Sequence, residues 1–235
     1  MGMPHGVGLL RLGEIDSTNE EARRRAEAGE RGPLWILAQR QTAGRGRRGA
    51  VWQAQAGNLT ATLLLAPPGN FAQLSFAVAL AVADLAQHFA PQARIAVKWP
   101  NDVLADGSKL AGILLEAGPD WLAIGIGVNL AGHPGGTEFP ATSLAALGVS
   151  PPAPDAALSV LAARFAHWYD RWMGNGFEDL RAAWLARAPQ RGAPIRARLP
   201  HETRHGLFEG IDASGALLLR DASGVRAIAA GEVFF

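Results

Sequence analysis

Apolar and polar positions along the chain follow two different spacings, and the spacing predicts where strands and helices lie. Residues 71–89 have apolar side chains spaced as on one face of a helix. The segments that are short, apolar and bounded by turn residues favour strands. We expect such strands at residues 34–40, 58–66, 94–98, 109–117 and 121–130.

Further helices are indicated by end signals. Ser17 and Glu20 have the spacing of a capping box, and Gly29 is a typical helix stop, so we expect a helix between them. Residues 155–188 are expected to form two helices, because the tryptophans at 168, 172 and 184 fall at helical spacing and prolines precede the segment.

The tail changes character after the prolines of residues 189–200. Short alternating segments at 205–212, 215–221 and 225–235 are separated by Asp-Ala-Ser-Gly turns, which predicts a small all-β unit. We therefore expect two domains, at residues 1–188 and 189–235. No internal repeat is found.

Composition limits the class of protein. With 22 basic against 21 acidic residues the net charge is +1, which argues against a polycation adapted to DNA or to an anionic membrane. The chain has no cysteine, and therefore no disulfide or thiolate metal site. The N-terminus lacks a signal-peptide pattern, and the apolar runs are too short or too interrupted to span a bilayer. We expect a cytoplasmic protein.

The two lysines of the chain, Lys98 and Lys109, lie in one short segment, while every other basic residue is arginine. A lysine kept where arginine is the rule suggests a compact ammonium charge at that place. The segment contains KWPND at 98–102 and KLAGIL at 109–114. Asn101 and Asp102 at a strand end could hold Mg²⁺ or polar substrate groups. The alternative is an Asn-Asp turn with a surface lysine.

A second motif, QTAGRGRRG at 41–49, follows the expected strand at 34–40. Alternating glycines let backbone N–H groups approach a ligand, and three arginines add forked donors, a combination suited to phosphate or carboxylate. An exposed basic turn or a nucleic-acid contact is the alternative. The spacing is neither that of a P-loop nor that of a dinucleotide fingerprint.

Five motifs in order, STN (17–19), QTAGRGRRG, KWPND, KLAGIL and GIGVNL (125–130), resemble those of the biotin protein ligases. The resemblance is strong over residues 14–147 and extends to the rest of the chain in layout. It implies an α+β fold: a mixed sheet flanked by helices, related to class II aminoacyl-tRNA synthetases, followed by a small β-barrel. It also indicates the monofunctional type, without an N-terminal DNA-binding domain, so no DNA partner is expected.

The resemblance implies a ligase that uses ATP and Mg²⁺ to form biotinyl-AMP and transfers biotin to a lysine of a biotin carboxyl carrier domain. It assigns catalysis to Lys109, Arg45 and Arg47. Asp102 is the nearest motif carboxylate, and we expect it to be catalytic as well, either binding the metal or orienting the acceptor amine. The biotin-binding residues would be Ser17, Thr18, Asn19, Gln41, Gly44, Arg45, Lys109, Gly112 and Gly127. The ATP-binding residues would be Arg47, Arg48, Trp52, Lys98, Trp99, Asn101 and Asn129.

Several alternatives stay open at this level. Ser17 and Thr18 could simply cap a helix, Trp52 and Trp99 could be core residues, and Glu116 and Asn129 could be buried hydrogen-bonding support. A lipoate or octanoate ligase or transferase shares the fold and a similar acceptor lysine. A catalytically silent sensor and a DNA-gripping regulator are disfavoured by the intact motifs and the balanced charge. The sequence neither requires nor excludes a homodimer.

Overall fold

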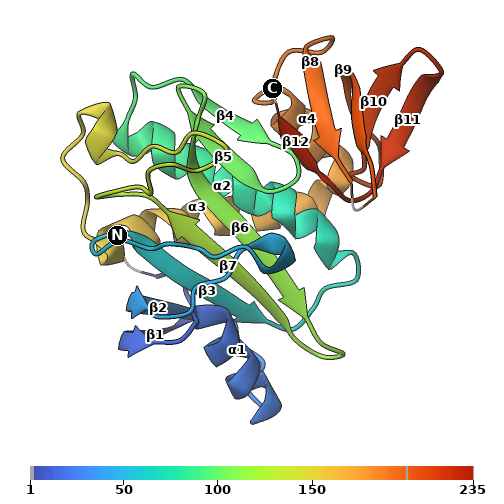
Figure 1. Ribbon diagram of the computed structural model, residues 1–235. Helices are drawn as coiled ribbons and strands as arrows, with labels where there is room; N and C mark the ends of the chain where they lie inside the picture. The colour runs from blue at the N-terminus through green and yellow to red at the C-terminus, as the bar shows by residue number, and fades with distance from the viewer. Residues whose placement is uncertain (1–2, 200, 235) are drawn as a thin grey trace.

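Seven strands form one mixed sheet in the computed structural model, which describes residues 3–199 and 201–234 (Figure 1). The strands are β1 (Gly8–Ile15), β2 (Leu34–Gln41), β3 (Leu59–Leu65), β4 (Ile95–Lys98), β5 (Asp102–Ala105), β6 (Ser108–Ala117) and β7 (Leu122–Val128). They lie in the order β1-β2-β3-β7-β6-β5-β4, with β1 and β2 parallel and each other neighbouring pair antiparallel. The expected mixed sheet is confirmed.

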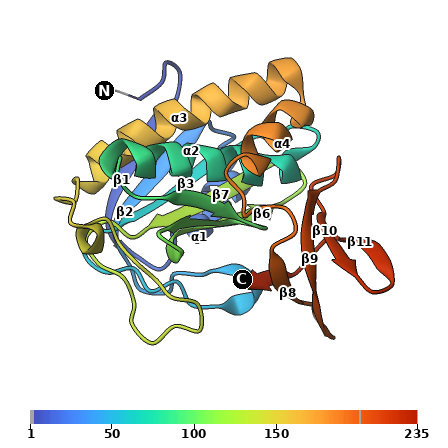
Figure 2. The same ribbon diagram turned by 90° about the horizontal axis from the view of Figure 1, so that it is seen from above.

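Helices cover both faces of this sheet because its strands alternate between two apolar surfaces. On β2, Trp35 belongs to the large core that packs α2 (Leu74–Phe89) and α3 (Pro154–Asn175). Its neighbour Ile36 belongs to a smaller core beneath α1 (Thr18–Glu27). Figure 2 shows α2 and α3 on one side of the sheet and α1 on the other.

The helix at Phe71–Phe89 is long and apolar enough to cross a membrane by length and composition alone. Of its most apolar window, 67% is buried inside the protein, where α2 packs against β4, β5 and β6 on one side and against α3 on another. A core helix covered on two sides has the same composition as a membrane span. Its apolar character is therefore explained by the core.

A second sheet follows α4 (Phe177–Leu185) and contains five antiparallel strands. They are β8 (Pro194–Arg198), β9 (Thr203–Ile211), β10 (Leu217–Asp221), β11 (Gly224–Ile228) and β12 (Glu232–Phe234), in the order β11-β10-β9-β8-β12. The edge strands β11 and β12 do not pair with each other within the described residues, so the expected barrel is an open sheet. Alternating sequence predicts strands but carries no information about whether a sheet closes.

The second sheet packs against the first part of the chain through a tryptophan and a turn. Trp99 is 2% exposed and donates its indole N–H to the Gly215 carbonyl at 3.0 Å. A Cβ atom on Gly215 would lie 2.8 Å from Phe76 of α2, so this turn approaches α2 very closely. These contacts hold the small sheet beside the edge of the main sheet that is formed by β4.

Three local expectations had different outcomes. The helix stop is confirmed, since Gly29 follows α1 with a φ of 98°. The capping box is wrong: Ser17 is the N-cap residue but makes no side-chain cap, and Glu20 turns instead towards Arg23 and Arg45. Strands β1 and β5 were not expected at all. Short 3₁₀ turns complete the chain at Arg47–Gly49, Phe71–Gln73 and Ala145–Leu147.

Candidate active site

A pocket of about 510 Å³ lies where α1 begins, between the glycine-rich loop and strands β5, β6 and β7. Its lining comes from all five motifs and, in addition, from the small C-terminal sheet. The predicted site residues that line it are Ser17, Thr18, Asn19, Gln41, Arg45, Arg47, Arg48, Trp52, Asn101, Asp102, Lys109, Gly112 and Gly127. Folding thus brings together segments more than 100 residues apart.

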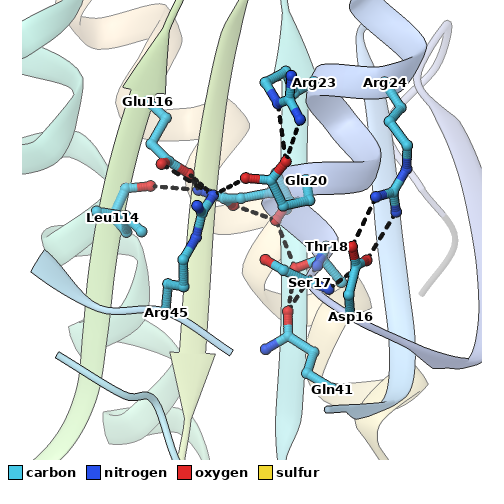
Figure 3. A network of polar contacts seen from close by, with 12 residues as sticks. Asp16, Ser17, Thr18, Glu20, Arg23, Arg24, Gln41, Arg45, Leu114 and Glu116 are labelled. Atoms are coloured by element: carbon cyan, nitrogen blue, oxygen red, sulfur yellow. Dashed lines mark hydrogen bonds and ion pairs between the residues drawn. The ribbon is translucent and has the colours of Figure 1, made fainter. Parts of the chain in front are cut away.

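A network of short hydrogen bonds, which we call the polar floor, links Thr18, Asn19, Gln41 and Thr62. The Thr62 hydroxyl lies 2.6 Å from Asn19 Oδ1 and 2.7 Å from Thr18 Oγ1, and Thr18 Oγ1 lies 2.9 Å from Gln41 Oε1. Gln41 Oε1 also accepts the Thr18 backbone N–H at 2.7 Å, which fixes its amide orientation. Figure 3 shows Thr18 and Gln41 facing each other across this network.

The polar floor is one proton short. Each hydroxyl has a single proton, and the two amide oxygens can only accept. With Thr62 donating to Asn19 and Thr18 donating to Gln41, the 2.7 Å contact between the two hydroxyls has no proton left. If a ligand N–H donated to Gln41 Oε1, the Thr18 proton could turn towards Thr62. The floor therefore suits a ligand that brings its own N–H donor.

Both polar atoms of the Asn19 amide are held by neighbouring side chains. It is 5% exposed, and a Cβ atom on Gly125 would lie 2.4 Å from its Oδ1, so the glycine of β7 makes room for the amide. Its Nδ2 donates to Glu116 Oε2 at 2.7 Å. Both ends of the amide are engaged within the protein, so Asn19 supports the polar floor while also bordering the pocket.

Arg45 points from the glycine-rich loop to two carboxylates. Its Nη2 pairs with Glu20 and lies 3.2 Å from Glu116 Oε1 (Figure 3). Glu20 is also paired with Arg23 at 2.7 Å. The hydrogen bond from Arg23 is the main influence that lowers the pKa of Glu20, and the charge of Arg45 adds to it. Glu20 is thus held in the ionised form that an arginine binds.

Trp52 lies over two strand glycines on the sheet. A Cβ atom at Gly127 would be 2.2 Å from the indole, and one at Gly112 would be 3.1 Å from it. Glycine is required at position 127 if the ring is to occupy this place. The indole N–H is buried and has no hydrogen-bond partner among the described residues.

Asp102 lies between the two lysines of the chain. Its Oδ1 is 2.6 Å from Lys109 Nζ, and its Oδ2 is 3.0 Å from Lys98 Nζ. Burial acts to raise the pKa of this carboxyl, but the positive charges of Lys109 and then Lys98 outweigh it and hold the pKa below its usual value. Asp102 therefore stays ionised, and Lys109, which is 31% exposed, faces the pocket.

Arg47 leaves the same loop as Arg45 but reaches the C-terminal sheet, where it donates to the Gly231 carbonyl at 3.2 Å. Burial lowers the pKa of Arg47, and Arg48 nearby adds to the effect. The guanidinium nevertheless remains charged at neutral pH. The pocket wall on this side also includes Arg198, Gly231 and Glu232, three residues that the motif pattern did not indicate.

Four predicted site residues lie behind the pocket rather than on its wall. Lys98 is 1% exposed and packs its ammonium 4.1 Å from the Phe139 ring centroid. Asn129 is buried and donates to the Thr142 carbonyl at 3.0 Å. Gly44 is overlain by the Trp52 carbonyl, and Trp99 is used in the junction with the C-terminal sheet. These four residues therefore do not form the wall of this pocket, and their contact with a ligand stays a prediction.

Two functional candidates were undervalued by the motif pattern. Glu20 was assigned to a capping box, and for Glu116 buried hydrogen-bonding support was favoured over a functional role. Both lie beside Arg45, and an acidic pair flanking an arginine-rich loop was the signal that could have identified them. Within residues 3–199 and 201–234, no cluster of three acidic or histidine side chains has the arrangement of a metal site.

Known proteins resemble this chain over nearly its whole length. Residues 14–129 match the Biotin/lipoate A/B protein ligase family, and residues 192–235 match the Biotin protein ligase C terminal domain. The biotin–[acetyl-CoA-carboxylase] ligase of Paracoccus denitrificans is 49% identical over 238 residues, covering 95% of this chain and 99% of that protein. The Mycobacterium tuberculosis protein of the same name is 34% identical over 234 residues, which cover 94% of this chain and 86% of that protein.

Among solved structures, a biotin protein ligase from Aquifex aeolicus in complex with biotin and ATP has a TM-score of 0.85 with this chain. The two share 28% sequence identity, and the alignment covers 97% of each chain. The likeness therefore extends to the small C-terminal sheet as well as to the main one.

Proposed function

The chain belongs to the biotin protein ligase family, and from this premise we propose that its pocket activates biotin with ATP and passes the biotin to a lysine of a carrier domain. The activity is that of an ATP-dependent ligase, and biotin and ATP are its substrates. The names of the relatives point to acetyl-CoA carboxylase as the source of the carrier domain. What each residue of the pocket does is inferred from the geometry described above.

The proton shortage of the polar floor is the observation that carries the choice of biotin. The ureido ring of biotin offers two N–H donors and one carbonyl acceptor, and burying it requires matched partners. A ureido N–H given to Gln41 Oε1 frees the Thr18 proton for Thr62 and completes the network. The Ser17 hydroxyl, which caps no helix, is available to the ureido carbonyl. The dithiolane ring of lipoate has no N–H and leaves the shortage in place.

The cationic end of the pocket suits the first half-reaction. A carboxylate oxygen of biotin attacks the α-phosphorus of ATP, a bond from carboxylate oxygen to phosphorus forms, and the bond to the pyrophosphate breaks. Two anions must approach each other, so fixed positive charge lowers the barrier. Lys109, held by Asp102 at 2.6 Å, is placed to lie between them, and Arg47 borders the same space.

The second half-reaction needs a neutral amine. A free lysine has a pKa of roughly 10.4, so only about one in a thousand is uncharged at neutral pH. The amine attacks the carbonyl carbon of the mixed anhydride, AMP leaves with the electron pair of the broken bond, and the amine loses a proton. Asp102, ionised at the edge of the pocket, is the carboxylate that can orient the incoming ammonium, and the released proton passes to solvent.

Magnesium is not well accommodated by the protein alone. Mg²⁺ is usually bound through one or two carboxylates together with substrate phosphates. Asp102 already has two ammonium groups within 3.0 Å, which compete with a metal ion for its two oxygens. We propose that Mg²⁺ enters with the triphosphate of ATP, and we assign no step to a metal held by Asp102. A cytoplasmic location and a homodimer stay predictions.

Transfer of radiolabelled biotin to a purified biotin carboxyl carrier domain, with and without ATP, tests the proposal. We expect ATP-dependent labelling of one lysine, and biotin-dependent exchange of pyrophosphate into ATP. Lipoate in place of biotin should give exchange at least about 100-fold weaker, because a site that hydrogen-bonds a substrate N–H rejects an analogue without it. Equal exchange with both acids would contradict the assignment of the polar floor to the ureido ring.

A further inference from the structure

The glycine-rich loop at residues 42–52 is a hairpin whose backbone hydrogen bonds are mainly internal. Arg45 forms a β-bridge with Val51, Gly46 donates to the Ala50 carbonyl at 2.7 Å, and Trp52 donates to the Gly44 carbonyl at 2.9 Å. Its far side is open to solvent, with Val51 74% exposed. A hairpin of this kind is a marginal structure by itself, so its position over the pocket depends on contacts with the body of the protein.

The side chain of Arg45 supplies such a contact. It enters a row of alternating charges in which Arg23 of α1 pairs with Glu20, Glu20 with Arg45, and Arg45 with Glu116 of β6 (Figure 3). We call Glu20, Arg45 and Glu116 the Arg45 clasp. It joins the loop to both α1 and the main sheet, whereas Arg47 joins it to the C-terminal sheet.

The clasp differs from an ordinary surface ion pair because both carboxylates are held before the arginine arrives. Isolated exposed ion pairs contribute little, since long side chains must be ordered to form them. Here Glu20 is 19% exposed and is held by Arg23. Glu116 accepts from the buried Asn19 amide at 2.7 Å. Arg45 therefore binds two carboxylates that other residues already hold in position.

The same hydrogen bonds connect the clasp to the polar floor. Glu116 is bonded to Asn19, Asn19 to Thr62, and Thr62 lies against Thr18. A ligand that completes the polar floor thus acts on the network that holds the loop. The residues that would bind the ureido ring and the carboxylates that hold Arg45 therefore belong to one hydrogen-bond network.

We propose that Glu20 and Glu116 are positioning residues that hold Arg45, and with it the loop at 42–52, over the occupied pocket. The part of this inference that concerns substrate rests on the proposed function. The part that concerns the loop does not, because the clasp is formed by the protein alone. Neither carboxylate touches the reacting atoms, and both act through the loop.

Trypsin tests the loop directly, because the loop contains Arg45, Arg47 and Arg48. Without substrates, the double variant Glu20→Gln with Glu116→Gln should be cleaved in the loop about tenfold faster than the natural protein, since two charged contacts are lost. Glu21→Gln is the matched control: it lies one residue further along α1 and pairs with Arg24 and Arg25 at 3.0 and 2.9 Å. The control should be cleaved in the loop at the same rate as the natural protein. The urea unfolding midpoints of the control and of the double variant should both match that of the natural protein. Unchanged loop cleavage in the double variant would overturn the inference.

A kinetic measurement separates positioning from a general structural effect. In the double variant the KM for biotin and the rate at which biotinyl-AMP escapes should rise about tenfold, while the turnover of pyrophosphate exchange at saturating substrate stays within about twofold. A fall in turnover with an unchanged KM would overturn the inference. If the natural protein itself failed to use biotin while loop cleavage responded as expected, the proposed function would be wrong and the clasp would stand.

Discussion

Lys109 and Asp102 form an ion pair of 2.6 Å at the edge of the pocket, and the same carboxylate keeps a second contact of 3.0 Å with the buried Lys98. This arrangement has a consequence for charge. If Lys109 turns towards an incoming anion, Asp102 is still neutralised by Lys98 and is not left as an isolated buried charge, which would cost several kcal/mol. Lys98 thus leaves Lys109 free to act.

Replacing Lys109 with arginine should abolish most adenylation. The planar guanidinium carries the same charge but cannot occupy the compact position of an ammonium between two anions. We expect biotin-dependent pyrophosphate exchange to fall at least about 100-fold, the usual scale for losing one stabilising group in a transition state. The urea unfolding midpoint serves as the control for folding. Near-normal exchange in a folded Lys109→Arg protein would remove Lys109 from the mechanism.

The Asp102→Asn substitution should affect both half-reactions. The amide leaves Lys98 and Lys109 close together without their shared counter-charge, so Lys109 is no longer held in place, and no carboxylate remains to orient the acceptor amine. We expect adenylation to fall roughly tenfold or more, and transfer from chemically prepared biotinyl-AMP to fall further. Full ligation in the variant would rule out the proposed roles of Asp102 in holding Lys109 and in orienting the acceptor amine.

Replacing Lys98 with methionine tests whether this lysine is a counter-ion or a ligand-binding group. It is 1% exposed, and we expect a loss of about 1–3 kcal/mol in the free energy of unfolding. Adding Asp102→Asn should restore much of the lost free energy of unfolding, because both partners of the Lys98–Asp102 ion pair are then removed. Activity should not return. Urea denaturation of the two single variants and the double variant measures the coupling. If the losses were simply additive, the ion pair would not be the reason that Lys98 is buried.

The sequence was sufficient for five of the seven strands of the main sheet and for most motif residues of the pocket. Short apolar segments and end signals identified five strands of the main sheet, and charge-bearing motifs identified Thr18, Arg47, Asp102 and Lys109, all of which line one pocket. These features are local, because each depends on residue types within a few positions. The edge strand β1 was missed because its pattern is interrupted by Gly8 and Gly13 and is half exposed.

What the sequence could not supply was contact between distant side chains. Nothing near Glu20 distinguishes a capping residue from a partner of Arg45, which lies 25 residues away in the chain. Trp99 and Lys98 occur within a ligand-binding motif, yet both are buried, because Trp99 packs against the C-terminal sheet and Lys98 pairs with Asp102. Closure of the C-terminal sheet likewise depends on packing that its strand pattern does not encode.

Gly127→Ala should disturb the covering of the pocket by Trp52. The new Cβ atom would lie 2.2 Å from the indole, which is less than any non-bonded contact permits, so the ring must move away from the sheet. We expect a change in tryptophan fluorescence and a rise of about tenfold or more in the KM for biotin. Gly13→Ala, where the added atom meets nothing within 4 Å, is the control. Unaltered fluorescence and KM would mean that Trp52 does not occupy this position in solution.

The ion pair between Asp16 and Arg24 next to the start of α1 should make a small, pH-dependent contribution to stability. The hydrogen bond from Arg24 is the main cause that lowers the pKa of Asp16 to about 2, from an ordinary 3.8. Because the pKa is lower in the folded state, the stabilisation is fully present above pH 4 and disappears as the pH falls from about 4 to about 2. Both side chains are more than 40% exposed, which limits the effect to about 1 kcal/mol at most.

Asp16→Asn isolates this charge, because the amide oxygen can still accept the Ser17 backbone N–H that Asp16 Oδ1 accepts at 2.7 Å. Urea unfolding at pH 6 should show the variant less stable by up to about 1 kcal/mol, and the difference should shrink at pH 3 and in 1 M NaCl, where the pair is screened. A difference that is the same at pH 6 and pH 3 would show that the loss comes from altered packing or from the helix start, because a lost ion pair must follow the ionisation of Asp16.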